Sequence, residues 1–247
     1  MKLKGSLLFT VLLLAMPALA GADMLSLTVG GGIWKESPSG TITNVTPGDD
    51  VIDVEKEFFW KEEDQSYFFI TFEHPVPLIP NVRLMKNKLD HSGSGPVSYT
   101  FNGQTFTGNV TNSFNIDQTD LTLYYEILDN VVSLDLGLNI KKNDVDYVVT
   151  DNSGNTTTDS ISNTIPMLYG LVGVTPYPGL TFSAEGSIIA YSGSSYSDLT
   201  AKVSYTSNYF IGGELGYRVQ KLELDDVSDY TSNLEFKGPF AGLYLKF

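Results

Sequence analysis

Apolar and polar residues alternate along much of the chain, and the alternation is clearest around a two-residue turn at Asp129 and Asn130. The apolar positions on one parity are Leu121, Leu123, Tyr125 and Ile127 before the turn and Val132, Leu134, Leu136, Leu138 and Ile140 after it. Successive side chains of a β-strand point to opposite faces of a sheet, so this pattern predicts two strands that share one apolar face. Such a hairpin is typical of a membrane-spanning sheet.

The same period-2 pattern recurs along the chain and predicts about ten strands. Short turns are expected at one end of these strands, near 74–80, 128–131, 176–179 and 207–209. Longer polar loops are expected at the other end, among them 36–64, 144–162 and 225–229. We therefore predict an all-β protein that folds as a closed antiparallel transmembrane β-barrel, with short periplasmic turns and long extracellular loops. The alternative is an eight-stranded barrel with residues 91–119 folded outside the membrane.

Several aromatic residues fall on the predicted apolar face near strand ends, where a membrane barrel carries an aromatic girdle. These residues are Tyr125, Tyr169, Tyr205, Tyr209, Tyr217 and Phe247. In the segment around Tyr169, the apolar parity is predicted to be Ile165, Met167, Tyr169 and Leu171.

The opposite face of the predicted strands carries charges of both signs among Gly, Ser and Thr residues. The charged positions are Glu73, Arg83, Glu126, Asp135, Glu185, Lys202, Glu214 and Arg218. In a narrow closed barrel these side chains can pair across the lumen, whereas a soluble sandwich would leave them on a solvated face. Glu126 and Asp135 could in principle do acid–base chemistry. We favour the interpretation that they face Arg83, Lys202 or Arg218 in a packing network.

The last ten residues alternate as a strand that ends on an aromatic residue, with apolar Ala241, Leu243 and Leu245 two residues apart before Phe247. This stretch resembles the C-terminal signature of bacterial outer-membrane β-barrels. The resemblance implies that the last strand pairs with the first. It also implies that Tyr244, Leu245 and Phe247 form an assembly signal that is read by the barrel-assembly machinery.

Longer segments extend the likeness to most of the chain beyond residue 22, the long loops being least alike. They are Pro80–Leu84, Asp120–Leu138, Pro166–Gly170, Gly216–Arg218 and Gly238–Phe247. Together they look like a family of small proteobacterial outer-membrane β-barrel proteins. The family has no assigned activity, so the resemblance implies fold and location in the cell outer membrane, not a specific function.

The N-terminus has the features of a secretory signal peptide. Lys2 and Lys4 precede an apolar stretch from Leu7 to Met16, and small residues allow cleavage after Ala20 or Ala22. We therefore expect a cleaved signal peptide over residues 1–22 and one outer-membrane barrel domain over 23–247. The chain has no cysteine and thus no disulfide framework.

A formal net charge of −14 argues against nucleic acid as a partner. The acidic loops suggest Ca²⁺ or bridging to lipopolysaccharide phosphates, but no loop has regular calcium-loop spacing, so a solvated surface is the expected role. We expect no metal and no cofactor. The expected partners are outer-membrane lipids and lipopolysaccharide, with the assembly machinery and periplasmic chaperones during biogenesis. We expect a monomer.

The chain contains two histidines. His74 lies in a Pro-rich periplasmic turn, and His91 follows Asp90 and precedes Ser92 at the start of an outer loop. That triplet offers a base, an orienting group and a nucleophile, but neighbours in sequence rarely align as a relay. We therefore expect no enzyme, and predict a plugged barrel with a structural or surface-interaction role. A narrow channel for small solutes is the alternative, followed by an enzyme that acts on lipid or peptide.

Overall fold

In the computed structural model, the structure describes residues 25–227 and 230–247, all of them in strands and their connections. The predicted signal peptide lies outside these residues. The strands are β1 (Ser26–Asn44), β2 (Ile52–Asp53), β3 (Glu63–Glu73), β4 (Asn81–Lys88), β5 (His91–Phe101), β6 (Gln104–Asp129), β7 (Val132–Asp151), β8 (Thr156–Tyr177), β9 (Leu180–Tyr191), β10 (Ser194–Thr206), β11 (Ile211–Val227) and β12 (Tyr230–Lys246). Within this part of the chain, no helix is long and apolar enough to cross a membrane.

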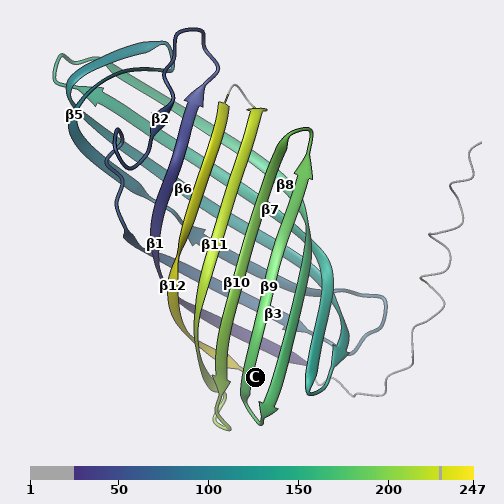
Figure 1. Cartoon of the computed structure of the whole chain (residues 1–247). Helices are drawn as coiled ribbons and strands as arrows, with labels where there is room; N and C mark the ends of the chain where they lie inside the picture. Colours follow the sequence, from purple (N-terminus) through teal and green to yellow (C-terminus); the bar gives the residue numbers. More distant parts are fainter. Residues whose placement is uncertain (1–24, 228–229) are drawn as a thin grey trace, which may run out of the picture.

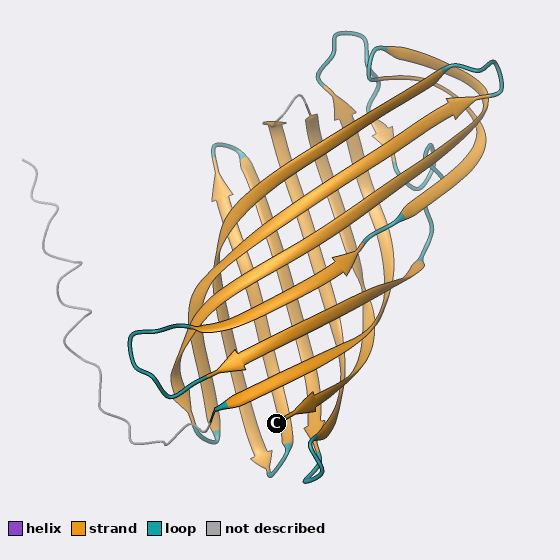
Figure 2. Ribbon diagram, turned by 180° about the vertical axis from the view of Figure 1, so that it is seen from behind, coloured by secondary structure: helices purple, strands orange, loops and turns teal. Residues whose placement is uncertain are grey.

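The strands form one closed antiparallel barrel, because β12 pairs with β1 as well as with β11 (Figures 1 and 2). β4 and β5 both pair with β6, one after the other, and so act as a single interrupted wall strand. β2 is a short addition to β1. The wall therefore has ten strands, which confirms the predicted barrel. The eight-stranded alternative is wrong, since residues 91–119 form part of the wall.

One end of the barrel, which we call the turn end, holds both the start of β1 and the end of β12. The amide nitrogen of Leu27 donates to the carbonyl of Phe247 at 3.0 Å. The connections at this end are residues 74–80, 130–131, 178–179 and 207–210, which confirms the predicted short turns. Gly179 in one of them has a φ of +81°, and a Cβ there would lie 2.3 Å from the carbonyl oxygen of Thr206, so the turn requires glycine.

The opposite end, which we call the loop end, differs from the prediction. Its long connection is 45–62, whereas β5–β6 and β9–β10 are joined by two residues each, and β7–β8 by residues 152–155. The predicted loop 144–162 is therefore wrong: most of it belongs to β7 and β8. These polar segments are strands because they pair with each other and β7 also pairs with β6; the hydroxyls of Thr150 and Thr156, for example, lie 3.1 Å apart.

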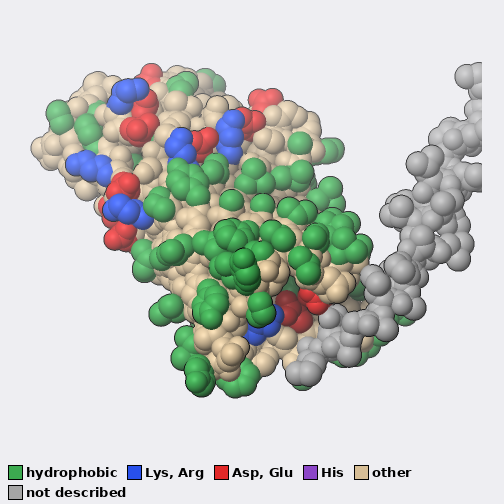
Figure 3. Space-filling model, turned by 60° about the horizontal axis from the view of Figure 1, so that its bottom comes forward, with side chains coloured by type: hydrophobic (Ala, Val, Ile, Leu, Met, Phe, Trp, Pro, Cys, Tyr) green, Lys and Arg blue, Asp and Glu red, His purple; other side chains and the backbone are tan. Residues whose placement is uncertain are grey.

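The outer face of the turn-end half is apolar and forms what we call the lipid belt (Figure 3). Its exposed side chains include Leu27 and Ile33 on β1, Phe68 on β3, Leu84 on β4, Leu138 on β7, Leu168 on β8, Phe182 on β9, Leu199 on β10, Leu215 on β11 and Leu243 on β12. Ion pairs occur on the outer face just beyond this belt, at Lys35–Glu62, Lys86–Asp117, Lys142–Asp144, Lys221–Glu223 and Lys237–Glu235. An apolar zone with a charged margin is what a lipid-spanning barrel requires.

The residues of β8 that face the lumen are those predicted to face outwards. Met167 and Tyr169 are 1% and 6% exposed and point into the barrel, whereas Leu168 is 65% exposed. Apolar residues occupy both parities of this strand, so alternation cannot decide its orientation. Pairing decides it, because Leu168 lies opposite Leu138 and Ile188, which both face outwards. Tyr169 is thus no part of an aromatic girdle.

The inside of the barrel changes character along its length. At the loop end, β6 points Phe106, Val110 and Phe114 inwards. Nearer the turn end, the same parity of the same strand carries Gln118 and Asp120, both buried. The outer face changes in the opposite sense, from apolar in the lipid belt to exposed Ser, Thr and Asn residues at the loop end. We call this polar outer surface the outer wall.

Candidate functional site: the barrel lumen

The loop-end half of the lumen is filled by what we call the plug segment, residues 51–60, which folds back inside the barrel. Its side chains Ile52, Val54, Phe58 and Trp60 are 0–3% exposed. Asn112 on β6 holds the segment in place: its amide nitrogen donates to the Phe58 carbonyl at 2.8 Å, and its oxygen accepts from Trp60 Nε1 at 2.9 Å. The long acidic connection therefore has an apolar centre that the inward-facing wall residues bury.

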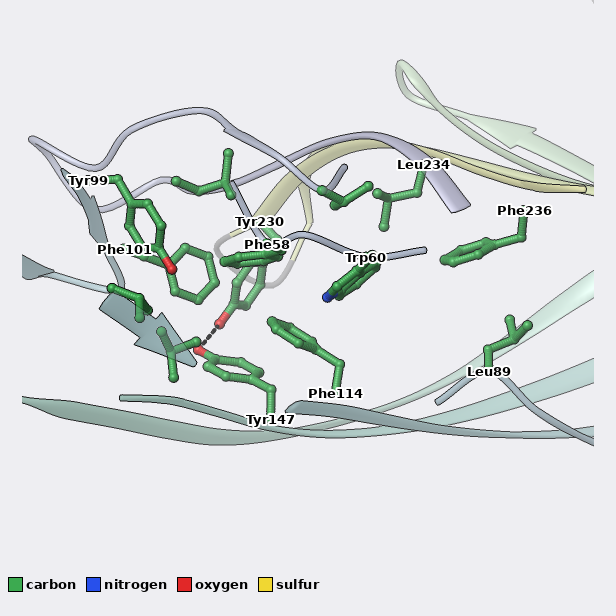
Figure 4. Close-up of a cluster of buried hydrophobic side chains, with 14 of the residues drawn as sticks. Phe58, Trp60, Leu89, Tyr99, Phe101, Phe114, Tyr147, Tyr230, Leu234 and Phe236 are labelled. Carbon is green, nitrogen blue, oxygen red and sulfur yellow. Dashed lines mark hydrogen bonds between the residues drawn. The ribbon is translucent and has the colours of Figure 1, made fainter. Parts of the chain in front are cut away.

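Aromatic rings pack around Phe58 in what we call the aromatic core (Figure 4). The Phe58 ring lies 5.1 Å from Phe114, 5.5 Å from Phe101 and 6.0 Å from Tyr99, between centroids. These distances are typical of favourable aromatic pairs. At the margin of the core, the hydroxyls of Tyr147 and Tyr230 lie 2.9 Å apart. The loop-end lumen is therefore packed like the interior of a soluble protein.

A buried acid–base pair lies within this core. His91 Nε2 is 3.0 Å from Glu36 Oε2, and both side chains are fully buried. The imidazole stacks between the rings of Trp60, at 4.8 Å, and Phe236, at 5.8 Å. Burial raises the pKa of Glu36 above its ordinary value, and His91 partly opposes this shift. The expected position of His91 at the start of an outer loop is thus wrong, because β5 begins there and points it inwards.

Below the aromatic core lies what we call the polar layer, which crosses the lumen near the margin of the lipid belt. Lys141, fully buried, lies 2.8 Å from Asp120 and 3.1 Å from Asp198. Arg218 pairs with Asp198 at 2.7 Å, and its guanidinium lies 4.9 Å from the Trp34 ring centre. A buried charge is tolerated only when it is paired and hydrogen-bonded, and here each carboxylate has a basic partner.

Three members of the polar layer, namely Asp120, Lys141 and Asp198, were not among the predicted lumen residues. The sequence did indicate the orientation of Lys141, because Lys141 lies an even number of residues from Asp135 along β7 and so shares its inward face. Asp120 likewise shares the inward parity of Thr122 and Tyr124 on β6. Both residues lie just beyond the clean apolar alternation, where the sequence changes to polar on both faces.

Four of the predicted lumen residues meet in one ion-pair group nearer the turn end. Arg83 lies 2.6 Å from Glu185, and Lys202 lies 3.5 Å from Glu185 and 3.1 Å from Glu214. The group joins β4, β9, β10 and β11 across the lumen. Tyr169, which points inwards, donates its hydroxyl to Glu185 at 3.1 Å.

The remaining predicted lumen residues do not join this group. Glu73 accepts a hydrogen bond from Tyr124 at 3.0 Å and lies 3.5 Å from Lys246. Glu126 accepts from Asn81 Nδ2 at 3.0 Å. The bases Arg83, Lys202 and Arg218, which were expected to face Glu126 and Asp135, pair with Glu185, Glu214 and Asp198.

Between these groups and the turn end, the lumen holds a cavity of about 370 Å³. Its lining runs from Trp34 and Arg218 in the middle of the barrel to Thr206 and Lys246 at the ends of their strands. Towards the loop end, the polar layer and the aromatic core close it. The cavity therefore lies on the turn-end side of the polar layer and the aromatic core.

The predicted assembly residues lie at the turn end of β12. Tyr244 points inwards, 9% exposed, with its hydroxyl 2.7 Å from that of Thr206. Leu245 faces outwards in the lipid belt. Phe247 is 59% exposed, and its ring stacks on Phe210 at 6.2 Å. The predicted pairing of the last strand with the first is present over most of their lengths.

His74 lies in the 74–80 connection at the turn end, as predicted, where its Nδ1 accepts a hydrogen bond from the amide of Val76 at 3.2 Å. Neither histidine thus lies on the loop-end surface. In the ranges 25–227 and 230–247, no group of three or more His, Asp or Glu side chains is placed to hold a metal ion.

No family model and no curated protein sequence matches the chain. Among solved structures, the outer membrane protease OmpT from Escherichia coli is similar over 92% of this chain and 98% of its own, with a TM-score of 0.57 and 9% sequence identity. The transport unit of the autotransporter AIDA-I from Escherichia coli covers 95% of this chain and 94% of its own, with a TM-score of 0.44 and 8% identity. Ail of Yersinia pestis is similar over 90% of this chain and 99% of its own, with a TM-score of 0.37 and 8% identity. At these identities the likeness concerns the fold: the chain has the fold of outer-membrane β-barrel proteins.

Proposed function

We propose that the protein is an integral outer-membrane barrel whose lumen is closed and whose role is structural or surface-interacting, with the turn end in the periplasm and the loop end outside. The observation that carries this proposal is the aromatic core with its buried plug segment. A solute crossing the barrel would have to displace fully buried rings such as Phe58 and Phe101. A protein that conducts solutes needs a continuous polar path instead.

The outer wall supports the surface-interaction role. Its strands extend beyond the lipid belt and expose hydroxyl, amide and charged side chains on a paired sheet, which is a firmer platform than mobile loops. We further propose that outer-membrane lipids and lipopolysaccharide contact the belt and its charged margin, and that the protein is a monomer.

The narrow-channel alternative requires gaps in both the polar layer and the aromatic core. The enzyme alternative draws on OmpT, which is a protease. Of the two histidines, His91 is buried in the core and His74 lies at the turn end. We therefore keep the proposal of a non-enzymatic barrel.

Planar-bilayer recording tests the closed lumen. Protein purified from membranes, with its fold verified by heat-shifted gel mobility, is expected to give no steady conductance steps while a general porin in the same bilayer does. Reproducible steps from the folded protein would favour the narrow channel.

Labelling of single cysteines tests the orientation, since the chain contains none. Thr158→Cys on the outer wall is expected to react with a membrane-impermeant maleimide in intact cells. Val76→Cys at the turn end, where Val76 is 49% exposed, should react only after the outer membrane is permeabilised. The reverse pattern would refute the proposed orientation.

We also propose that the end of β12 acts as the assembly signal. Phe247→Ala removes an exposed terminal ring and is expected to lower the yield of folded protein in the outer membrane. Tyr209→Ala is the control, because Tyr209 is an 82% exposed aromatic residue at the same end. Equal yields of the two variants would count against a special role for the terminal aromatic residue.

A further inference from the structure

Among the described residues, Asp135 is a lumen carboxylate that no donor or basic side chain is seen to contact. Asp135 on β7 is 8% exposed and lines the cavity. Among the residues described, none donates a hydrogen bond to it and no basic side chain lies within ion-pair distance. Its cross-strand neighbour on β6 is Glu126, another carboxylate. Burying an ionised carboxylate without a counter-charge is costly, so a positive group placed next to Asp135 would be stabilised there.

The whole cavity has the same imbalance. Its lining contains eight carboxylates and four basic side chains. All four bases are engaged away from Asp135: Arg83 and Lys202 with Glu185, Arg218 with Asp198, and Lys246 with Glu73. The fully buried Lys141 is held between Asp120 and Asp198. The described lining therefore carries more carboxylates than basic side chains.

The size and lining of the cavity indicate what kind of cation fits. A volume of about 370 Å³ far exceeds that of a single metal ion and lies within the range of small-molecule pockets. The described carboxylates do not converge on a point as metal ligands would. The lining also includes the rings of Phe69, Tyr124 and Tyr169, whose faces attract organic cations.

We propose that this cavity is a binding site for a small organic amine, with Asp135 as the principal counter-charge. The ammonium group lies against Asp135 on the β6–β7 side of the lumen, and the carbon skeleton rests on the aromatic side chains. The ligand enters from the turn end, because the polar layer and the aromatic core close the other side. The site is separate from the outer wall, so it does not depend on the proposed surface role.

Isothermal titration calorimetry of the detergent-solubilised protein with 1,4-diaminobutane tests the site. We expect saturable binding that weakens with added salt. Asp135→Asn keeps the shape of the side chain and removes its charge, and is expected to weaken binding about tenfold or more. Asp144→Asn is the matched control: it removes a carboxylate from the same strand, but on the outer face, and should leave the affinity unchanged.

Four results would overturn the proposal. They are no saturable heat with the folded wild type, equal affinity in Asp135→Asn and wild type, equal loss of affinity in Asp144→Asn, and tighter binding of Mg²⁺ than of the diamine at the same site. Heat-shifted gel mobility verifies that each variant is folded. Should Asp135→Asn fail to fold, Glu126→Gln serves as the second variant, with weaker binding as the expected result and unchanged affinity as the contrary one. Amine binding and conductance are independent readouts, so one proposal can fail while the other stands.

Discussion

The two halves of the barrel share one sheet and have opposite chemistry. In the turn-end half, the outer face is apolar and the lumen is polar and charged. In the loop-end half, the outer face is polar and the lumen is an aromatic core. On β6 alone, Leu121 and Leu123 point outwards in the first half, and Phe106 and Phe114 point inwards in the second. The parity of the strand is constant, and only the chemistry of each face is exchanged.

The exchange shows that the surroundings of each half decide which face is apolar. Against lipid, apolar side chains belong outside, and polar lumen groups must satisfy one another. Against water, the outer face can be polar, and the lumen can be filled by apolar burial as in a soluble protein. The polar layer, with Lys141, Asp198 and Arg218, lies where the two arrangements meet.

Breaking the polar layer should have the largest effect. Arg218→Ala leaves Asp198 with one basic partner and is expected to lower the free energy of unfolding by about 3–5 kcal/mol, the cost of breaking a buried ion pair. Denaturant unfolding in lipid vesicles measures it. Lys142→Ala, which removes an exposed pair with Asp144, should cost no more than about 1 kcal/mol. Similar losses in both variants would mean that the buried layer is not special.

Removing a ring from the centre of the aromatic core should have the second-largest effect on stability. Phe58→Ala removes a ring that is 0% exposed and is expected to cost about 3 kcal/mol, with faster proteolysis within the plug segment. Val51→Ala is the control, because Val51 is 63% exposed in the same segment. Unchanged proteolysis of Phe58→Ala would indicate that the segment is held by its backbone contacts alone.

A charge placed on the outer face should destabilise the turn-end half much more than the loop-end half. Leu168→Arg in the lipid belt is expected to destabilise the vesicle-inserted protein by about 2–4 kcal/mol. Thr158→Arg lies on the same face of β8 in the outer wall and should change stability by less than about 0.5 kcal/mol. Equal effects at the two positions would refute the assigned boundary of the belt.

The smallest effect should appear in the pH dependence. Because burial raises the pKa of Glu36, the folded protein binds its proton more tightly than the unfolded chain does. The contribution of Glu36 to the free energy of unfolding is therefore fully present below the ordinary Glu pKa of about 4.3. It is lost as the pH rises through the raised pKa. Glu36→Gln should flatten this part of the profile of unfolding free energy against pH. A profile identical to wild type would contradict the raised pKa.

Local pattern was enough to predict several parts of the fold. The hairpin around Asp129 and Asn130 and the four turn-end connections follow from period-2 alternation and turn residues. The pairing of the last strand with the first was implied by the resemblance of the C-terminal segment to outer-membrane barrels. In these segments one face meets lipid and only one parity is apolar, so a shift by one residue would expose polar groups to lipid. The pattern left the strand count between ten and eight, and the pairing of residues 91–119 within the wall decides it.

Other features depend on segments that are distant in sequence. β8 has apolar residues on both parities, and only pairing with β7 and β9 decides that Tyr169 points inwards. The polar ends of β7 and β8 look like loops in isolation and become strands because neighbours complete their hydrogen bonds.

By itself, then, the sequence determined lipid-spanning strands and the parity of most of them, because those depend on residues two apart. The tertiary structure alone decided how the lumen is filled. In it, the plug segment packs onto Asn112, and His91 stacks between Trp60 and Phe236. The bases Arg83, Lys202 and Arg218 pair with carboxylates other than Asp135, which has no such partner among the described residues. Such contacts join residues that are close in space after closure and far apart along the chain, where no local pattern records them.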